Sequence, residues 1–72
     1  MMSKFNYPEP LKKDIGCKVS WYTYSNLDDA KKASEIAKEE MEHCLRLGYD
    51  FGYCYPSDIR DNKDGTYTVT LP

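Results

Sequence analysis

One helical segment dominates this chain and limits the folds open to it. In residues 27–47, small or apolar side chains recur at the spacing that places them on one side of a helix. They are Ala30, Ala33, Ala37, Met41, Cys44 and Leu45. Asp28 and Asp29 suit the positive start of a helix, and Gly48 is the left-handed residue expected after its end. Because the stripe is mostly small, the helix is expected to lie close to the surface that it covers.

The surface beneath the helix is predicted to be a small β-sheet. Residues 17–25 are rich in β-branched and aromatic side chains, which favours a strand. Residues 49–55 alternate aromatic with small or polar side chains and predict another strand. Residues 57–71 contain a turn at 61–65 and predict a hairpin. In its second strand, Tyr67, Val69 and Leu71 are expected to face the core and the three threonines the other side. The order β-α-β-β predicts an α+β fold, with one helix packed on a small, mainly antiparallel sheet.

The chain is expected to form a single folded domain with an N-terminal arm. Residues 1–15 contain Pro8 and Pro10, which favour an extended path, so the arm is assigned there and the domain to residues 16–72. A domain of this size buries only about 60% of the surface of its unfolded chain. Small domains often gain stability from a partner subunit. We therefore expect a homo-oligomer.

Alternation along the first strand divides its side chains between two faces. Val19 and Trp21 are predicted to enter the core. Tyr22 and Tyr24 would then point to the face that no helix covers. The chain has seven tyrosines, two phenylalanines and one tryptophan, which are more rings than a sheet with one helix can bury. Since exposed aromatic residues gather at binding surfaces, we predict a ligand or partner site made of Tyr22, Tyr24, Tyr53, Tyr55, Arg60 and Lys18.

The charge and the cysteine content of the sequence argue against several classes of protein. Ten basic and twelve acidic residues give a net charge of −2, which argues against a dedicated nucleic-acid-binding protein. Cys17, Cys44 and Cys54 are an odd number of cysteines with no signal peptide before them, so free thiols and a cytoplasmic location are expected. No apolar run approaches the roughly 20 residues of a membrane span. No membrane association is therefore predicted.

No catalytic or metal-binding motif stands out in the sequence. His43 is the only histidine, and its neighbour Cys44 points about 100° away around the helix, so the two do not readily share an ion. A nucleophile activated by His43 would be Cys54 or Ser57, but the spacing does not support either pair. We predict no metal, no cofactor and no enzymatic activity.

Two apolar residues of the helix lie beside the core stripe. Ile36 and Leu47 fall to one side of it. They either broaden the core face and cover a loop, or contact another subunit. The sequence leaves both alternatives open.

Part of the chain follows the pattern of a known domain family. The matching segments are Tyr24-Ser25-Asn26, Asp29-Ala30, Gly48-Tyr49 and Asp64-Gly65-Thr66-Tyr67-Thr68-Val69. This pattern resembles the first half of a SPOR domain, the peptidoglycan-binding repeat of cell-division proteins. The resemblance implies the same strand–helix–hairpin architecture. No binding residue is carried over from it.

A second resemblance concerns the last third of the chain. It is carried by Gly48-Tyr49-Asp50-Phe51-Gly52-Tyr53, Pro56-Ser57, Ile59-Arg60 and Asp64-Gly65-Thr66-Tyr67. These segments resemble the short accessory proteins of tailed bacteriophages. The resemblance implies work in the cytoplasm of a host cell, either blocking a host protein or sequestering a small signalling nucleotide.

Two functions are compatible with these observations. The first is a small non-enzymatic binding protein that captures a host protein or a small anionic ligand, such as a nucleotide, on its aromatic surface. In that case two subunits would meet on the open sheet face and enclose the ligand. The alternative is a structural or assembly module that recognises peptide or glycan through the open face of its sheet.

Overall fold

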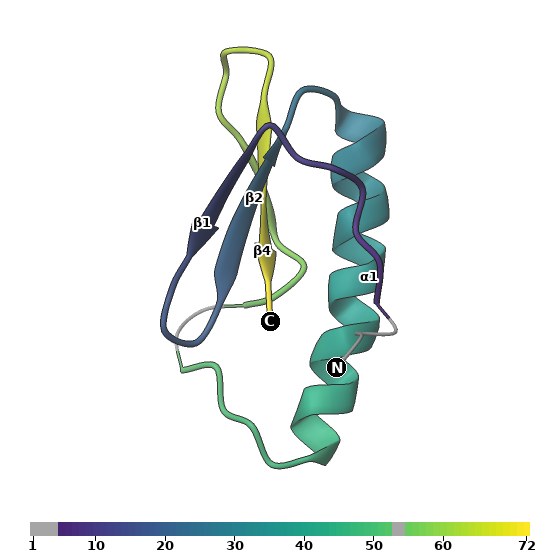
Figure 1. Ribbon diagram of the computed structural model, residues 1–72, viewed down its shortest axis with the longest axis vertical. Helices are drawn as coiled ribbons and strands as arrows, with labels where there is room; N and C mark the ends of the chain where they lie inside the picture. The colour runs from purple at the N-terminus through teal and green to yellow at the C-terminus, as the bar shows by residue number, and fades with distance from the viewer. Residues whose placement is uncertain (1–4, 53–54) are drawn as a thin grey trace.

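The computed structural model describes residues 5–52 and 55–72 and shows one helix lying along one face of an antiparallel sheet (Figure 1). The elements are β1 (Lys12–Ile15), β2 (Ser20–Tyr24), α1 (Leu27–Arg46), β3 (Ile59–Asp61) and β4 (Tyr67–Leu71). The strand order in the sheet is β1-β2-β4-β3, and each neighbouring pair is antiparallel. The predicted fold class, a helix on a small antiparallel sheet, is confirmed.

The helix forms where the sequence predicts it. The Asn26 side chain caps its start by accepting a hydrogen bond from the Asp29 backbone N–H, at 2.8 Å. Its end is closed by Gly48, which has a φ of 91°, and by a hydrogen bond of 3.1 Å from the Tyr49 N–H to the Cys44 carbonyl. The buried helical residues are Ala30, Ala33, Ala37 and Met41. The three alanines let α1 approach β4 and β2 closely.

The N-terminal segment holds a strand that the sequence does not indicate. Residues 12–15, part of the predicted arm, form β1 and pair with β2. The turn between them is closed by a 2.9 Å hydrogen bond from the Gly16 N–H to the Val19 carbonyl. Lys12, Lys13 and Asp14 carry no β-strand preference of their own. Pairing with a neighbouring strand, which is a tertiary effect, makes this segment extended.

The orientation of β2 is the reverse of the prediction. Tyr24, expected on the open face, is 1% exposed and lies in the core, and Tyr22 packs against the same cluster. Opposite residues of an antiparallel pair share a face, and the register sets Tyr22 opposite the buried Val69. Trp21 therefore projects to the open face instead of the core. The Tyr24 hydroxyl donates a 2.9 Å hydrogen bond to the Pro8 carbonyl, so its burial leaves no polar group unpaired.

The predicted strand at residues 49–55 is wrong for the part that the structure describes. Residues 49–52 and 55 are irregular, and residues 53 and 54 lie outside the described residues. The Asp50 side chain accepts a 2.9 Å hydrogen bond from the Gly52 N–H, and Gly52 has a φ of 65°. This turn overrides the alternating pattern. Phe51 still reaches a second core cluster, where it joins Val19 and Met41.

Residues 5–10 run alongside α1 (Figure 1). The Tyr7 hydroxyl donates a hydrogen bond to the Glu40 carboxylate, and the Tyr7 ring meets the Tyr22 ring edge-on at 5.9 Å. Ile36, half-buried, lines a hollow together with Tyr7 and Pro8, so it lies beside this segment. Leu47 is exposed at the end of the helix. Within the described residues, Cys17 and Cys44 are free thiols.

Tyr7 and Tyr24 are expected to make the folded protein less stable at alkaline pH. Burial, followed by the hydrogen bond to Glu40, raises the pKa of Tyr7, and burial raises the pKa of Tyr24 to about 12. Because the folded protein holds these protons more tightly than the unfolded chain, their contribution to stability is complete below about pH 10. It is lost as the pH rises through the folded-state pKa. Urea unfolding from neutral pH to about pH 12 should show this decline.

The variant Tyr7→Phe tests the source of the alkaline decline. It removes one of the two titrating hydroxyls, so its free energy of unfolding should fall less steeply above about pH 10 than that of the wild type. A decline as steep as in the wild-type protein would show that Tyr7 does not contribute.

Candidate functional site

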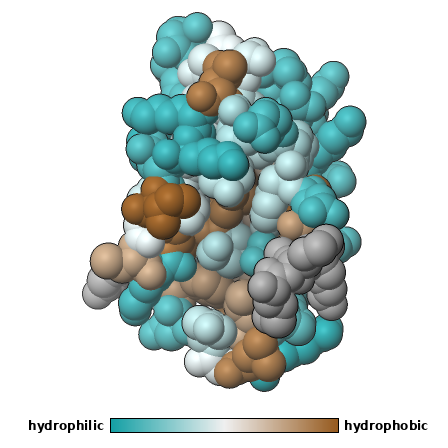
Figure 2. Space-filling model, in the orientation of Figure 1, coloured by the Kyte–Doolittle hydropathy of each residue, from teal (hydrophilic) through white to brown (hydrophobic). Residues whose placement is uncertain are grey.

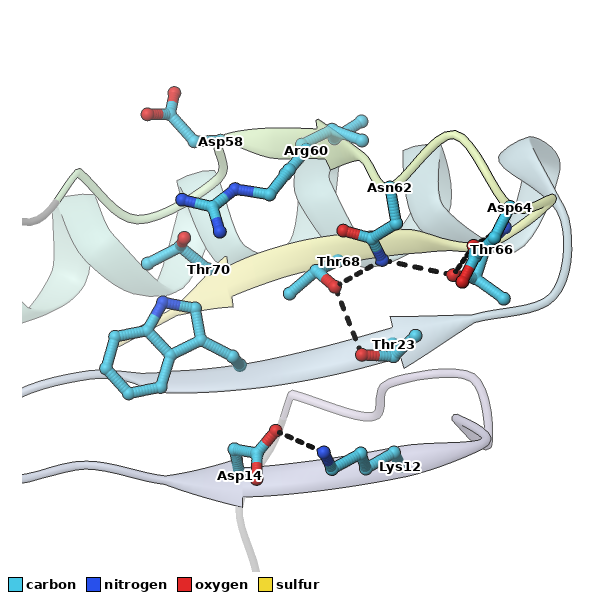
Figure 3. Close-up of a pocket in the computed structure, with 12 residues that line it drawn as sticks. Lys12, Asp14, Thr23, Asp58, Arg60, Asn62, Asp64, Thr66, Thr68 and Thr70 are labelled. Atoms are coloured by element: carbon cyan, nitrogen blue, oxygen red, sulfur yellow. Dashed lines mark hydrogen bonds and ion pairs between the residues drawn. The ribbon is translucent and has the colours of Figure 1, made fainter.

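A broad hollow of about 970 Å³ lies on the sheet face that α1 leaves uncovered (Figure 3). Its lining comes from all four strands and from the β3–β4 turn. The lining residues are Lys12, Asp14, Trp21, Thr23, Asp58, Ile59, Arg60, Asn62, Asp64, Thr66, Thr68 and Thr70. We call this surface the open face. Two further hollows lie along α1 and the N-terminal segment.

Strand register arranges the open face in rows that cross the sheet. One row consists of Lys12, Thr23, Thr68 and Arg60. It carries a cation on each edge strand and two threonines between them, as Figure 3 shows. A second row places Trp21 between Asp14 and Thr70. Alternation along each strand therefore gathers charged, hydroxyl and aromatic groups on one surface.

Hydrogen bonds fix the hydroxyl groups at the centre of the open face. The Thr23 and Thr68 hydroxyl oxygens are 3.1 Å apart. The Asn62 amide nitrogen donates to the hydroxyl oxygens of Thr68, at 2.9 Å, and Thr66, at 3.1 Å (Figure 3). These contacts pre-organise the polar groups, which lowers the entropy lost when a ligand binds.

The only tryptophan of the chain is half-buried on this face. Trp21 packs beside the cluster of Val19, Met41 and Phe51. Gly16 makes room for the ring, because a Cβ there would lie 2.8 Å from Cζ3 of Trp21 and 2.6 Å from the Val19 carbonyl oxygen. The indole is thus held by the β1–β2 turn and partly open to solvent.

Carboxylates outnumber cations around the open face. Lys12 and Arg60 are the cations of the lining. The carboxylates are Asp14, Asp58 and Asp64. Hydrogen bonds from the Thr66 hydroxyl and backbone N–H lower the pKa of Asp64, which keeps it ionised. The lining therefore offers donors and acceptors together and has no excess of positive charge.

Six residues were predicted to form the site, and of the five that the structure describes, only Arg60 lines the open face. Tyr22 and Tyr24 lie on the helix side of the sheet. Tyr55 and Lys18 are exposed outside the lining, and Tyr53 lies outside the described residues. The prediction missed Trp21 and the threonines. The alternating threonines of residues 66–70 were the available signal, since their predicted face is the open one.

His43 and Cys44, which were considered for chemistry, lie apart from the open face. His43 sits on α1 beside the Phe5 ring, at 6.1 Å between ring centroids. In residues 5–52 and 55–72, no three histidine, cysteine or acidic residues come together as a potential metal site. The same residues contain no helix with the length and hydropathy of a membrane span.

Comparison of the chain with protein families, with curated proteins and with solved structures gave no match.

Proposed function

We propose that this protein is a non-enzymatic binding module that holds an uncharged glycan on the open face of its sheet. One observation carries the proposal: the half-buried indole of Trp21 lies in a row with Asp14 and Thr70, beside a second row of hydroxyl and cationic groups. The function is thus the recognition of a sugar chain through a flat, polar surface with one aromatic ring.

A sugar ring matches this mixture of groups. Its faces carry C–H groups, which suit the negative face of an aromatic ring, and its edges carry hydroxyls that both donate and accept hydrogen bonds. Arg60 and Lys12 supply donors, whereas Asp14 and Asp58 supply acceptors. A ligand hydroxyl that displaces water here therefore finds a partner of either kind.

The charge of the open face favours an uncharged ligand over a nucleotide. Phosphate binding uses cations in excess, commonly arginine in bidentate contact, yet three carboxylates share the lining of the open face with Lys12 and Arg60. Three of the tyrosines expected to stack on a base, Tyr22, Tyr24 and Tyr55, are also absent from the lining of this surface. An extended peptide would seek backbone partners at a strand edge or apolar pockets, and the lining is mainly polar.

The fluorescence of Trp21 provides a direct test of glycan binding. Trp21 is the only tryptophan in the sequence, so all tryptophan emission comes from the proposed site. Titration with uncharged β-linked glucose or N-acetylglucosamine oligomers should change its emission in a saturable way. Replacing Trp21 by alanine should weaken binding, measured by calorimetry, by about 2 kcal/mol or more, the usual effect of removing a central aromatic contact. This corresponds to roughly thirtyfold in the dissociation constant.

Tyr55→Ala is the matched control for this experiment. It also removes an aromatic side chain, but from an exposed position outside the open face, so affinity should be unchanged. Mononucleotides and cyclic dinucleotides should leave the Trp21 emission unaltered. Saturable binding of these nucleotides, with no response to the sugar oligomers, would overturn the glycan proposal.

A further inference from the structure

The strand β1 forms an edge of the sheet whose outer side has no strand partner among the described residues (Figure 1). The Gly16 N–H points inward to the Val19 carbonyl. Because this direction alternates along an antiparallel strand, the backbone groups of Lys13 and Ile15 point outward, away from β2. This edge can therefore accept another strand.

Exposed apolar side chains stand at both ends of this edge. Ile15 is 74% exposed and Leu11, directly before β1, is 66% exposed. Figure 2 shows that hydrophobic residues on the side of the molecule in view form separate patches among hydrophilic ones. A partner for this edge should therefore offer apolar groups at its two ends and polar groups between them.

We propose that β1 pairs antiparallel with β1 of a second copy of the chain, around a two-fold axis at Lys13. In this register Lys12 lies opposite Asp14 of the second copy, and Asp14 opposite its Lys12. At both ends the exposed Leu11 side chain lies near Ile15 of the second copy, but the Leu11 N–H donates to the Thr23 carbonyl of its own chain and takes no part in the new ladder. The outward N–H and C=O of Lys13 exchange two hydrogen bonds with the same groups of the second copy. The product is one continuous sheet of eight strands.

Charge selects this register over its neighbours. A shift by two residues in either direction sets Asp14 opposite Asp14 or Lys12 opposite Lys12, and like charges directly opposite each other are destabilising. A shift by one residue would place side chains of the two sheet faces opposite each other. In the proposed register, Lys12 and Asp14 of the two copies alternate in sign around a square. Within one chain these two side chains already lie 3.7 Å apart.

The proposed register also sets Lys13 opposite Lys13 of the second copy. The repulsion between these two ammonium groups is reduced by a contact inside each subunit. The Lys13 ammonium lies over the Tyr22 ring, 5.5 Å from its centroid. This cation–π contact draws the charge back from the strand edge toward its own core. The two ammonium groups are thereby held away from the axis.

Complementary charge reversals test the proposed edge pairing. Wild-type protein at high micromolar concentration should show a mass by light scattering that rises with concentration toward that of a dimer. Lys12→Glu sets a second carboxylate opposite Asp14 of the other copy, and Asp14→Lys sets a second ammonium group opposite its Lys12. Each variant alone should therefore dimerise at least about tenfold more weakly. An equal mixture of the two variants should recover the dimer, since only the mixed pair has opposite charges at both contacts.

Lys31→Glu is the matched control, because it makes the same charge change at an exposed position on α1. Its dimerisation should equal that of the wild-type protein. Circular dichroism should show native helix content in every variant, since Lys12 and Asp14 are exposed. A wild-type protein that stays monomeric at high micromolar concentration, or a mixture no more associated than its separate variants, would overturn the proposal. Lys12 and Asp14 also line the open face, so association is measured without any sugar oligomer, and the result then does not depend on glycan binding.

Discussion

Replacing Tyr24 by alanine is expected to destabilise the domain by about 3–5 kcal/mol, the range for deleting a fully buried aromatic ring. A folded chain of 72 residues has a total free energy of unfolding of about 4–11 kcal/mol. Tyr24 is among the largest fully buried side chains and packs with Ala30, Ala33 and Val69. The variant should therefore be partly or wholly unfolded at room temperature, as measured by circular dichroism during urea titration.

Two further variants show which part of Tyr24 matters. Tyr24→Phe keeps the ring and loses only the hydrogen bond to Pro8, which should cost about 0.5–1.5 kcal/mol. Tyr55→Ala deletes the same kind of ring at an exposed site and should stay within about 0.5 kcal/mol of the wild type. Native stability in Tyr24→Ala would mean that Tyr24 faces solvent, and that β2 has the opposite orientation.

Replacing Ala37 by leucine is expected to cost about 1–3 kcal/mol through overpacking. Ala37 is completely buried in the cluster that joins α1 to β4 and β2. A larger side chain there must push the helix away from Val69 and Leu71 or adopt a strained conformation. The thermal midpoint should fall, by roughly 4–8 °C for each kcal/mol in a domain of this size.

Lys38→Leu is the matched control for Ala37→Leu. It introduces the same side chain at the next position, where α1 is exposed. Because no neighbour has to move there, its stability should lie within about 0.5 kcal/mol of the wild type. Equal destabilisation by the two leucines would contradict the close contact of α1 with the sheet.

Local patterns in the sequence were sufficient for α1 and for the β3–β4 hairpin. The helix has a small-residue stripe of period 3.6 and a glycine after its end, and these signals act within a few residues. In β4, alternation assigned Val69 and Leu71 to the core and the threonines to the other face, as the structure shows. This strand was predictable because its two faces differ clearly in polarity.

The structure of the other segments depended on contacts that the local sequence pattern does not reveal. The two faces of β2 both carry aromatic rings, so alternation alone could not choose between them, and pairing with β4 decided that Tyr24 is buried. Residues 12–15 are mostly charged and became a strand only by pairing with β2. At residues 49–52, a turn formed by Asp50 overrode a clear strand pattern.

The sequence by itself therefore determined the class of the fold, the extent of its helix and the polar character of one face of β4. Tertiary structure alone decided which aromatic ring of β2 lies on the same face of the sheet as the threonines of β4. A reversal of β2 exchanges its side chains between core and solvent, and it replaced the predicted surface of Tyr22 and Tyr24 by Trp21 and Thr23. Val19, just before this strand, is buried as predicted. The physical reason is that strand register is set by pairing across the sheet, whereas helix periodicity is set within one segment.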